Sequence, residues 1–362
     1  PTDYWVGNPD DYSNDDDLPP WAPGGIGPAW NSAFYTLTAK PVETLGGNVK
    51  RFLKRKELQA ERGERSRGRV DVLRVGLESF VELAGADVAI TCVTASLLSR
   101  FRDELEGLVA DGKLKPHSAR DRLQAMKQFV RWAWEEELIG LPRNMESREF
   151  SIALPEQRIE TFTDAEVQRL LSAASEAMKL YLLLFLNCGM TQGDIADLLQ
   201  SEVDWDKGRI NRKRSKTRTA SDNVPSVSYA LWPETFRLLK QCRSKHERLA
   251  LTNQKGGPLK VESFVNGKLK KKDNVHSAYC RLITKIAAAE TDPIKITKPL
   301  KLLRKTAATK LGQNPKYGRF AQYFLGHAPT TVADKHYVAP STEQFDEAVP
   351  WLGTQFLVSI VD

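Results

Sequence analysis

The chain has 362 residues, of which 41% are hydrophobic and 27% are charged, and its formal net charge is +7. This length predicts two or three domains with ample core, and no apolar run approaches the roughly 20 residues that a membrane span needs. The four cysteines are scattered and form no C-x-x-C pair, which argues against a zinc ribbon or a disulfide framework. A reduced, cytoplasmic setting is therefore expected.

Charge is unevenly distributed along the chain. Residues 1–40 hold six aspartates and one lysine, so the rest of the chain carries a net charge of +12. A basic body favours a polyanionic partner such as nucleic acid, although many basic proteins bind none. The acidic stretch predicts a tail, or an arm that docks on the body or on a partner subunit. A dense basic run at 49–69 is either a solvated helix face or, as we favour, a contact with phosphates. We place residues 1–66 in this arm and basic segment.

Residues 67–145 are expected to form a small helical domain, because their apolar residues recur at helical spacing. A second helix should begin near Thr94 and end at Gly112, and Ser118 is expected to cap a third. The third helix carries apolar residues for the core and basic residues that either provide solubility or enter a DNA groove. The candidates for DNA contact on this helix are Arg120, Arg122, Lys127 and Arg131.

Residues 146–160 are interpreted as a linker, and a capping box that begins at Thr163 opens a second domain, 161–340. Helices are expected at about 164–175, 177–187, 192–200, 231–245 and 275–289, and strands near 202–206, 209–213 and 219–228. Lys268–Lys272 is expected to be a basic loop, and Lys271 in it and Lys305 further on are further candidates for DNA contact.

The tail, 341–362, is apolar but contains Pro350, which predicts a kinked or broken helix. We expect this helix to dock on a neighbouring subunit, or otherwise on its own body.

The residues with the clearest chemistry gather in one C-terminal stretch. Lys301, Arg304 and Lys305 supply positive charge. His327 ends a Leu-Gly-His sequence, and Tyr337 follows ten residues later. The arginine fork makes two hydrogen bonds at once and keeps its proton, which suits the negative charge that develops when a phosphodiester is attacked. A phenol has an unperturbed pKa near ~10, so Tyr337 must lose its proton during attack or lie near cations.

With these residues at this spacing, the chain resembles the tyrosine recombinases of the phage-integrase family. The family's second box is His-x-x-Arg, often followed by His; here Lys301 and Lys305 occupy both histidine positions, and the Leu-Gly-His matches outright. Ser215-Lys216-Thr217 resembles the family's β-hairpin lysine, and the resemblance covers roughly 70–350. It implies a multidomain fold, mainly α with a small β-sheet, in which a helical (SAM-like) core-binding domain precedes a mixed α/β catalytic domain.

The resemblance also implies a role for each residue of the site. Tyr337 would attack the phosphate and form a 3′-phosphotyrosyl intermediate. Arg304 and His327 would bind the developing charge, with help from Lys301. Lys216 would protonate the leaving 5′ oxygen. Because the phosphotyrosyl link conserves the energy of the broken bond, this mechanism requires neither ATP nor a metal.

One position departs from the family pattern. The first box is a Gly-x-Arg sequence between two helices, and Thr191 stands where the arginine is expected. A hydroxyl donates one hydrogen bond but supplies no charge. Either another cation fills the gap, for which Lys305, Arg212 and Arg214 are candidates, or the protein cuts slowly or only binds DNA. The retained tyrosine, arginine and histidine favour an active enzyme.

The sequence therefore predicts a site-specific DNA recombinase that acts on double-stranded DNA. Family resemblance implies a homo-oligomer, a tetramer on DNA, and a cytoplasmic, nucleoid-associated location without a membrane. One alternative is a non-catalytic or weakly active, sequence-specific DNA-binding protein derived from a recombinase. The other is a topoisomerase of type IB or a hairpin-resolving enzyme that uses the same site.

Overall fold

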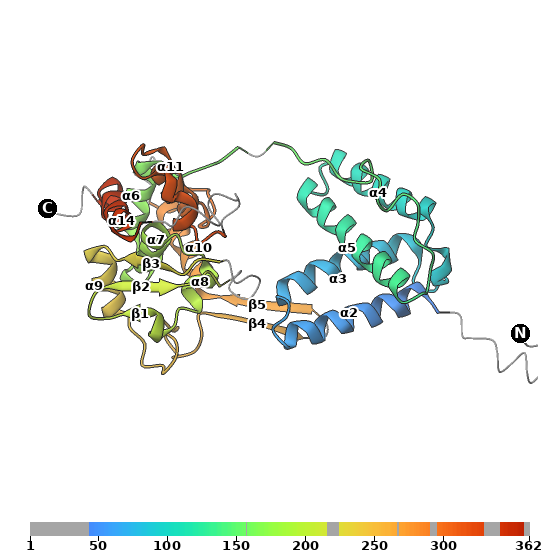
Figure 1. Ribbon diagram of the computed structural model, residues 1–362, viewed down its shortest axis with the longest axis horizontal. Coiled ribbons are helices and arrows are strands. Elements are labelled where there is room, and N and C mark those ends of the chain that lie inside the picture. The colour runs from blue at the N-terminus through green and yellow to red at the C-terminus, as the bar shows by residue number, and fades with distance from the viewer. Residues whose placement is uncertain are drawn as a thin grey trace, which may run out of the picture. The chain divides into compact units, whose positions relative to one another are not determined.

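The computed structural model describes residues 43–156, 158–215, 224–265, 268–289, 295–328 and 341–357 (Figure 1). Several sequence expectations lie outside these residues: the N-terminal arm as far as residue 42, Lys216, the first half of the strand expected at 219–228, Tyr337, and the tail beyond residue 357. The chain divides into two compact units, Pro1–Pro155 and Glu156–Asp362, and each has its own hydrophobic core. Within the described residues, no helix is both long and apolar enough to cross a membrane.

The first unit is helical. Its elements are α2 (Leu45–Glu61), α3 (Arg67–Ala84), η3 (Ile90–Cys92), α4 (Ala95–Ala110) and α5 (Pro116–Glu135). The predicted start of the second helix near Thr94 is confirmed: Thr94 is the N-cap of α4, and its hydroxyl accepts from the Leu97 amide. The expected start of the third helix at Ser118 is wrong. Lys115 is the N-cap and Pro116 opens the helix, where proline has a suitable φ and no amide to leave unpaired.

The core of this unit forms where α2, α3 and α5 pack together. Gly76 on α3 permits close approach to α5, because a Cβ there would lie 2.6 Å from the Ala125 Cβ. Phe52 on α2 contacts Phe129 and Trp132 on α5, with ring centroids 5.8 and 5.3 Å apart. The helical unit thus begins well before the expected boundary at residue 67, and part of the expected basic segment is one face of α2.

The second unit is a mixed α/β structure. Its helices are α6 (Asp164–Ala173), α7 (Glu176–Cys188), α8 (Gln192–Ala196), η4 (Gln200–Glu202), α9 (Pro233–Gln241), α10 (Asn274–Ala287), α11 (Leu302–Gln313), η5 (Gly318–Phe320), α12 (Ala321–Phe324) and α14 (Thr342–Leu357). The strands β1 (Val203–Asp204), β2 (Arg209–Arg212) and β3 (Val227–Ala230) form an antiparallel sheet in that order. The predicted capping box at Thr163 is confirmed at the start of α6.

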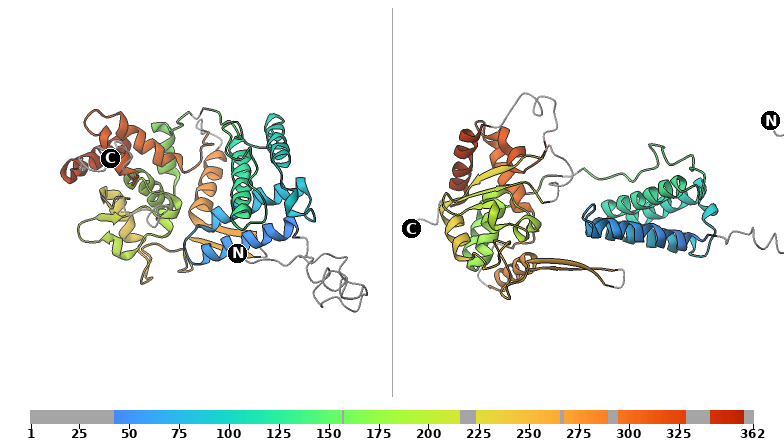
Figure 2. Two further views of the ribbon diagram at one scale, coloured as in Figure 1. Left: turned by 45° about the vertical axis from the view of Figure 1, so that its right-hand side comes forward. Right: turned by 60° about the horizontal axis from the view of Figure 1, so that its bottom comes forward.

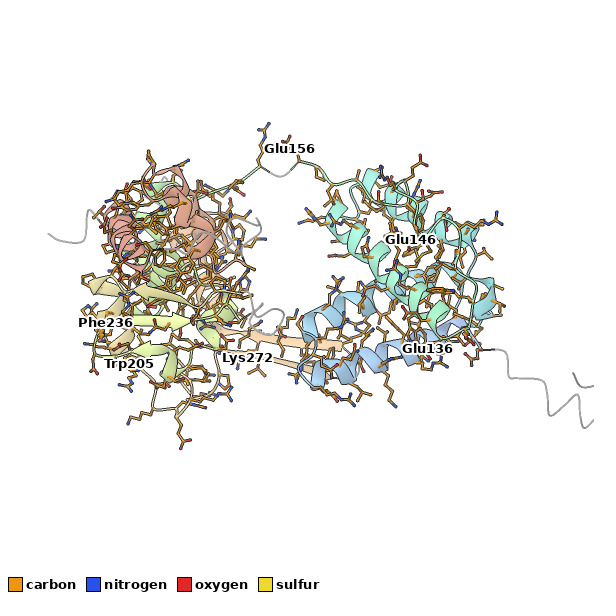
Figure 3. The ribbon with its side chains drawn as sticks, viewed as in Figure 1. Glu136, Glu146, Glu156, Trp205, Phe236 and Lys272 are labelled. Atoms are coloured by element: carbon orange, nitrogen blue, oxygen red, sulfur yellow. The ribbon has the colours of Figure 1, made fainter. Side chains whose placement is uncertain are left out.

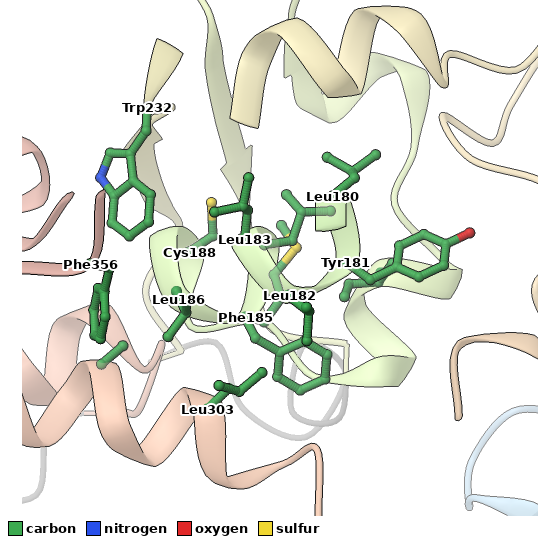
Figure 4. Close-up of a cluster of buried hydrophobic side chains, with 14 of the residues drawn as sticks. Leu180, Tyr181, Leu182, Leu183, Phe185, Leu186, Cys188, Trp232, Leu303 and Phe356 are labelled. Atoms are coloured by element: carbon green, nitrogen blue, oxygen red, sulfur yellow. The ribbon is translucent and has the colours of Figure 1, made fainter. Parts of the chain in front are cut away.

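Helix α7 lies at the centre of this unit. It is apolar on nearly all sides, which is typical of a helix that is buried on every face. Figure 4 shows Leu183 and Phe185 of α7 among side chains from other elements, including Trp232, Leu303 and Phe356. Because α7 ends at Cys188 and is capped by Gly189, this core fixes the position of the segment that follows the helix.

Lys268–Lys272 is part of a strand and not the expected loop. β5 (Lys268–Asp273) pairs antiparallel with β4 (Lys260–Val265), and Phe264 stands opposite Leu269. Side-chain exposure along β4 alternates between half-buried and exposed, which is the period of a strand. The lysine-rich composition of β5 hides such a period in the sequence. Figure 2 shows this hairpin extending away from the body of the second unit.

The tail helix α14 packs on its own unit. Phe345, Val349, Leu352 and Phe356 are buried in the core of that unit, and the Trp232 indole donates to the Val349 carbonyl at 2.8 Å. Four of the apolar residues of the tail that suggested docking on a neighbouring subunit are therefore covered by this unit.

Candidate active site

Arg304 is held at the junction of three helices. It lies on the first turns of α11, and its Nη1 donates to the carbonyl of Gly189, which caps the C-terminus of α7. Its Nη2 donates to the carbonyl of Leu325, at the end of α12, at 2.6 Å. Gly189 is required here for two reasons: its φ is +56°, and a Cβ would lie 2.8 Å from the Phe324 ring. The guanidinium is thus fixed in place before any ligand binds.

The Leu-Gly-His sequence is the C-terminal cap of α12. Gly326 has a φ of +58°, its amide donates to the Tyr323 carbonyl at 2.7 Å, and the His327 amide donates to the Gln322 carbonyl at 3.1 Å. This pair of bonds is a Schellman motif, which requires a residue such as glycine in the left-handed conformation. The motif turns the chain so that His327 Nε2 lies 3.5 Å from Arg304 Nη2.

A residue that the sequence reasoning missed orients this histidine. His327 Nδ1 lies 2.7 Å from Gln322 Oε1. Because a carbonyl oxygen only accepts, Nδ1 is the donor, and Nε2 of the neutral ring carries no proton. No sequence signal marks Gln322, since its contact with His327 exists only once the helix cap has formed.

Burial and like charge affect the ionisation of both groups. Desolvation, followed by the charges of Arg304 and Arg214, lowers the pKa of His327 below its usual range. Desolvation, followed by the charge of Arg214, lowers the pKa of Arg304 to about 10. Arg304 remains charged at neutral pH, whereas His327 is neutral.

Thr191 is engaged in starting a helix. It is the N-cap of α8; its Oγ1 donates to Asp194 Oδ2 at 2.7 Å and accepts from the Asp194 amide at 3.3 Å. The Thr191 amide in turn donates to Asp194 Oδ2 at 2.8 Å, which completes a capping box. The side chain at the first-box position is therefore bound within its own turn.

Arg212 is buried in a network of carboxylates. It is 5% exposed and donates to the Asp194 carbonyl at 2.6 Å and to Asp197 Oδ1 at 2.8 Å, and Glu202 lies 3.4 Å away. Desolvation lowers its pKa, but Asp197 and Glu202 more than offset this, so the pKa is raised. Removing one partner of such a buried pair generally costs about 3–5 kcal/mol, so Arg212 is a structural residue of this unit.

Asp194 joins this network to the chain beyond β2. Its Oδ1 accepts from the amide and the hydroxyl of Ser215, at 2.9 and 2.7 Å. Burial raises the pKa of Asp194, but the hydrogen bonds from Thr191 and Ser215 and the charge of Arg212 outweigh burial and hold the pKa below its usual range. An ionised carboxylate thus ties α8 to the residues just before Lys216.

The other catalytic candidates are exposed or outside the described residues. Lys301 is the N-cap of α11, and Lys305 lies one residue after Arg304; both side chains are exposed. Lys216 and Tyr337 lie outside the described residues. Within the part of the chain that the structure covers, no group of three His, Cys, Asp or Glu side chains could hold a metal ion.

Two of the DNA-contact candidates on α5 take part in packing the first unit. Lys127 donates to the Phe150 carbonyl at 2.5 Å and lies 4.7 Å from the centre of its ring, and desolvation lowers its pKa. Arg122 donates to the Ser79 hydroxyl on α3 at 3.2 Å. Both side chains are half-buried, which makes them weaker candidates for phosphate contact than exposed neighbours.

The remaining candidates are more accessible. Arg131 is exposed and pairs with Glu146 at 2.6 Å (Glu146 is labelled in Figure 3), and Arg120 is exposed near the start of α5. Lys271 is exposed on β5, where it stands opposite Glu262.

Solved structures of integrases share this architecture. A lambda integrase dimer bound to a COC′ core site has a TM-score of 0.55 and 18% identity, over 83% of this chain and 100% of that chain. A lambda integrase tetramer bound to a Holliday junction has a TM-score of 0.56 and 18% identity, over 85% and 83%. The Tn1549 transposon integrase in complex with transposon right end DNA has a TM-score of 0.56 and 12% identity, over 86% and 100%. The fold is that of the tyrosine recombinases.

Residues 160–344 match the phage integrase family. The chain belongs to that family, and the predicted fold class, mainly α with small sheets, is confirmed. No curated protein sequence matches this chain.

Proposed function

We propose that this protein is a site-specific DNA recombinase that cleaves and rejoins double-stranded DNA through a 3′-phosphotyrosyl intermediate at Tyr337. The observation that carries the proposal is the convergence of Arg304 and His327, with Nη2 and Nε2 3.5 Å apart. Tyr337 follows His327 by ten residues in the sequence. When a phenol attacks a phosphate, the reaction requires a nucleophile and groups that bind the developing charge, and these three side chains would supply them.

Arg304 would stabilise the charge that develops on the phosphate. Two of its nitrogens hold the carbonyls of Gly189 and Leu325, and a guanidinium with five N–H groups retains others for the phosphate oxygens. Because the group is already oriented, it needs no rearrangement as charge develops. Preorganised donors of this kind are commonly worth ~100–1000-fold in rate each.

His327 would act on the same phosphate through Nε2. The ring is neutral in the free protein because burial and the neighbouring arginines disfavour its charge. A bound phosphate brings negative charge beside the ring, which favours the protonated form. We propose that His327 takes up a proton as the phosphate binds and then donates from Nε2 to a phosphate oxygen.

Lysines would complete the chemistry. Ser215 is anchored to Asp194, so the chain is fixed immediately before Lys216, the proposed acid for the leaving 5′ oxygen. The exposed Lys301 and Lys305 flank Arg304 and are proposed to contact the phosphate or its neighbours along the strand. None of these roles calls for ATP or a metal.

The proposed partners are double-stranded DNA and further copies of the chain. Solved integrases of this fold are bound to DNA, one of them as a tetramer on a Holliday junction. We propose that both units of this chain bind the duplex, that the active assembly is a tetramer, and that it acts on the chromosome in the cytoplasm. The basic balance of residues 41–362 is consistent with this partner.

The test is a covalent trapping experiment. A duplex recovered from a random pool by selection with the full chain is nicked near the cleavage point, so that the cleaved fragment diffuses away. We expect a denaturation-resistant protein–DNA adduct with the wild-type chain and none with Tyr337→Phe, because phenylalanine lacks the attacking oxygen. Tyr323→Phe is the matched control and should still form the adduct, since the Tyr323 hydroxyl donates to the Ser226 carbonyl.

An adduct that persists in Tyr337→Phe would exclude this tyrosine as the nucleophile. Tight, sequence-selective binding by the wild type with no adduct would favour a DNA-binding protein derived from a recombinase. Relaxation of supercoiled plasmid with no preferred site would favour a topoisomerase.

A further inference from the structure

The loss of the first-box arginine leaves a phosphate site with one fixed guanidinium. The Thr191 hydroxyl is bonded to Asp194, and it brings no positive charge. Sequence reasoning left three cations as substitutes: Lys305, Arg212 and Arg214. The structure distinguishes among them.

Two of the three are unsuitable. Arg212 is 5% exposed and bonded to Asp197 and Ser215, so its buried guanidinium cannot turn to a ligand without losing these partners. Lys305 is exposed on α11, and an ammonium on a flexible stem lacks the fork that binds two phosphate oxygens together.

Arg214 is held beside the site by its neighbours in the sequence. On one side is buried Arg212; on the other is Ser215, whose amide and hydroxyl are bonded to Asp194. A Cβ placed on Gly326 would lie 3.5 Å from the Arg214 Cβ. Gly326 belongs to the same turn that presents His327 and the Leu325 carbonyl, so Arg214 lies against the segment that holds Arg304.

Arg214 also lines a small pocket beside Arg304. Arg304, Gly189, Asp194 and Leu325 line this pocket together with Arg214. The Arg214 Nε is buried and has no hydrogen-bond partner among the residues that the structure describes. The charge of Arg214 contributes to the lowered pKa of both Arg304 and His327. Two guanidinium groups beside an imidazole repel one another unless an anion lies between them.

We infer that Arg214 replaces the missing first-box arginine and binds a non-bridging oxygen of the scissile phosphate together with Arg304. This inference rests on the proposed recombinase function. It also explains the threonine: Thr191 caps α8 with Asp194, and the second oxygen of Asp194 anchors Ser215 and therefore the chain at Arg214. Position 191 therefore does not supply a guanidinium itself; its threonine helps to hold Arg214 in place.

The test measures single-turnover cleavage of the selected, nicked duplex by the full-length chain. Arg214→Gln keeps a polar, though shorter, side chain and removes the charge; we expect cleavage ~100-fold slower or worse. The dissociation constant should change by about 10-fold or less, as expected for one phosphate contact. Arg214→Lys restores charge without the fork and should recover part of the rate. Lys213→Gln removes the neighbouring cation and is the matched control, with a rate close to that of the wild type.

A second substrate separates catalysis from folding. Replacing a non-bridging oxygen of the scissile phosphate by a methyl group removes the charge that Arg214 would bind. The deficit of Arg214→Gln should then shrink to less than about 10-fold, since no charge remains for the lost guanidinium to stabilise. A purely structural defect would slow both substrates equally, and that result would overturn the inference. If Arg214→Gln does not fold, the same comparison made with Arg214→Lys decides the matter.

The two levels of proposal fail separately. Cleavage by Arg214→Gln at the wild-type rate would overturn this inference alone. A wild-type chain that binds the selected duplex but never forms an adduct would overturn the proposed function, and this inference with it.

Discussion

A neutral histidine beside a charged arginine defines the state of the site before DNA arrives. The His327 Nδ1 donates to Gln322, and Nε2 faces Arg304 Nη2 at 3.5 Å. Desolvation and then the charges of Arg304 and Arg214 lower the pKa of His327 below its usual range. Protonation is therefore resisted in the free protein and favoured once a phosphate supplies negative charge.

This arrangement predicts proton uptake on DNA binding. The His327 pKa is lowered in the free protein, and the charge of a bound phosphate should raise it, so we expect the complex to hold more protons between the two values. DNA affinity should therefore increase as the pH falls through that window, and no further once the pH is below the pKa of the free protein. Titrations of the selected duplex between about pH 5 and 8 measure this slope.

His327→Gln should remove the slope, whereas His276→Gln, on an exposed position of α10, should leave it unchanged. A slope that is the same in wild type and His327→Gln would show that this ring does not titrate on binding.

At the scale of residues, the sequence predicted those groups whose chemistry is legible from type and short spacing. Arg304 and His327 were both singled out, and the structure brings them together. Gln322 and the anchoring of Arg214 could not be foreseen. The role of Gln322 depends on a helix cap, and the anchoring of Arg214 depends on the carboxylate of Asp194, twenty residues earlier in the chain.

At the scale of elements, the β4–β5 hairpin has two chemically different faces. Cross-strand partners share a face, and Lys268, Lys270 and Lys272 pair with Val265, Ser263 and Val261. These three lysines are exposed, and Val261 and Val265 are 45% and 39% exposed (Lys272 is labelled in Figure 3). The other face carries Phe264 opposite Leu269 and Glu262 opposite Lys271. We propose that the face with three lysines contacts DNA phosphates.

Neutralising that face should weaken DNA binding in a salt-dependent manner. For the triple variant Lys268→Gln, Lys270→Gln, Lys272→Gln, we expect the slope of log affinity against log salt to decrease in magnitude by ~2.7, about 0.9 for each lost contact. Fluorescence anisotropy at several salt concentrations gives the slope. Lys271→Gln, on the opposite face, should change this slope by less than about 0.9, the value for one phosphate contact. A larger effect from Lys271→Gln than from the triple variant would assign the contact to the other face.

Elements with a clear period or cap were predictable, and elements that depend on long-range pairing were not. The capping box at Thr163 and the helix that begins after Thr94 were both recognised from local residues. β5 was predicted to be a loop because its lysine-rich composition hides the period of a strand, and its pairing with β4 is not visible in the sequence. α14 was expected to dock on a neighbouring subunit or on its own body, and the sequence alone does not reveal that its described residues pack beside Trp232.

At the scale of the whole molecule, one chain segment joins two units that each have a core. Residues 158–160 are exposed, and Ile159 is 73% exposed. The first unit is helical, whereas the second contains Arg304, His327 and Arg214. If both units bind one duplex, the segment between them makes the second contact an intramolecular event with a high effective concentration.

Cutting this segment should therefore weaken DNA binding without altering either core. A specific protease site inserted among residues 156–160 allows the same protein to be measured before and after cleavage. We expect the affinity for the selected duplex to fall by about 100-fold or more on cleavage, because tethered binding typically exceeds that of separate modules by ~10²–10⁴. The uncut insertion variant is the control and should bind like the wild type. Equal affinity before and after cutting would mean that one unit alone binds the duplex, and the basic residues of the other unit would then need a different explanation.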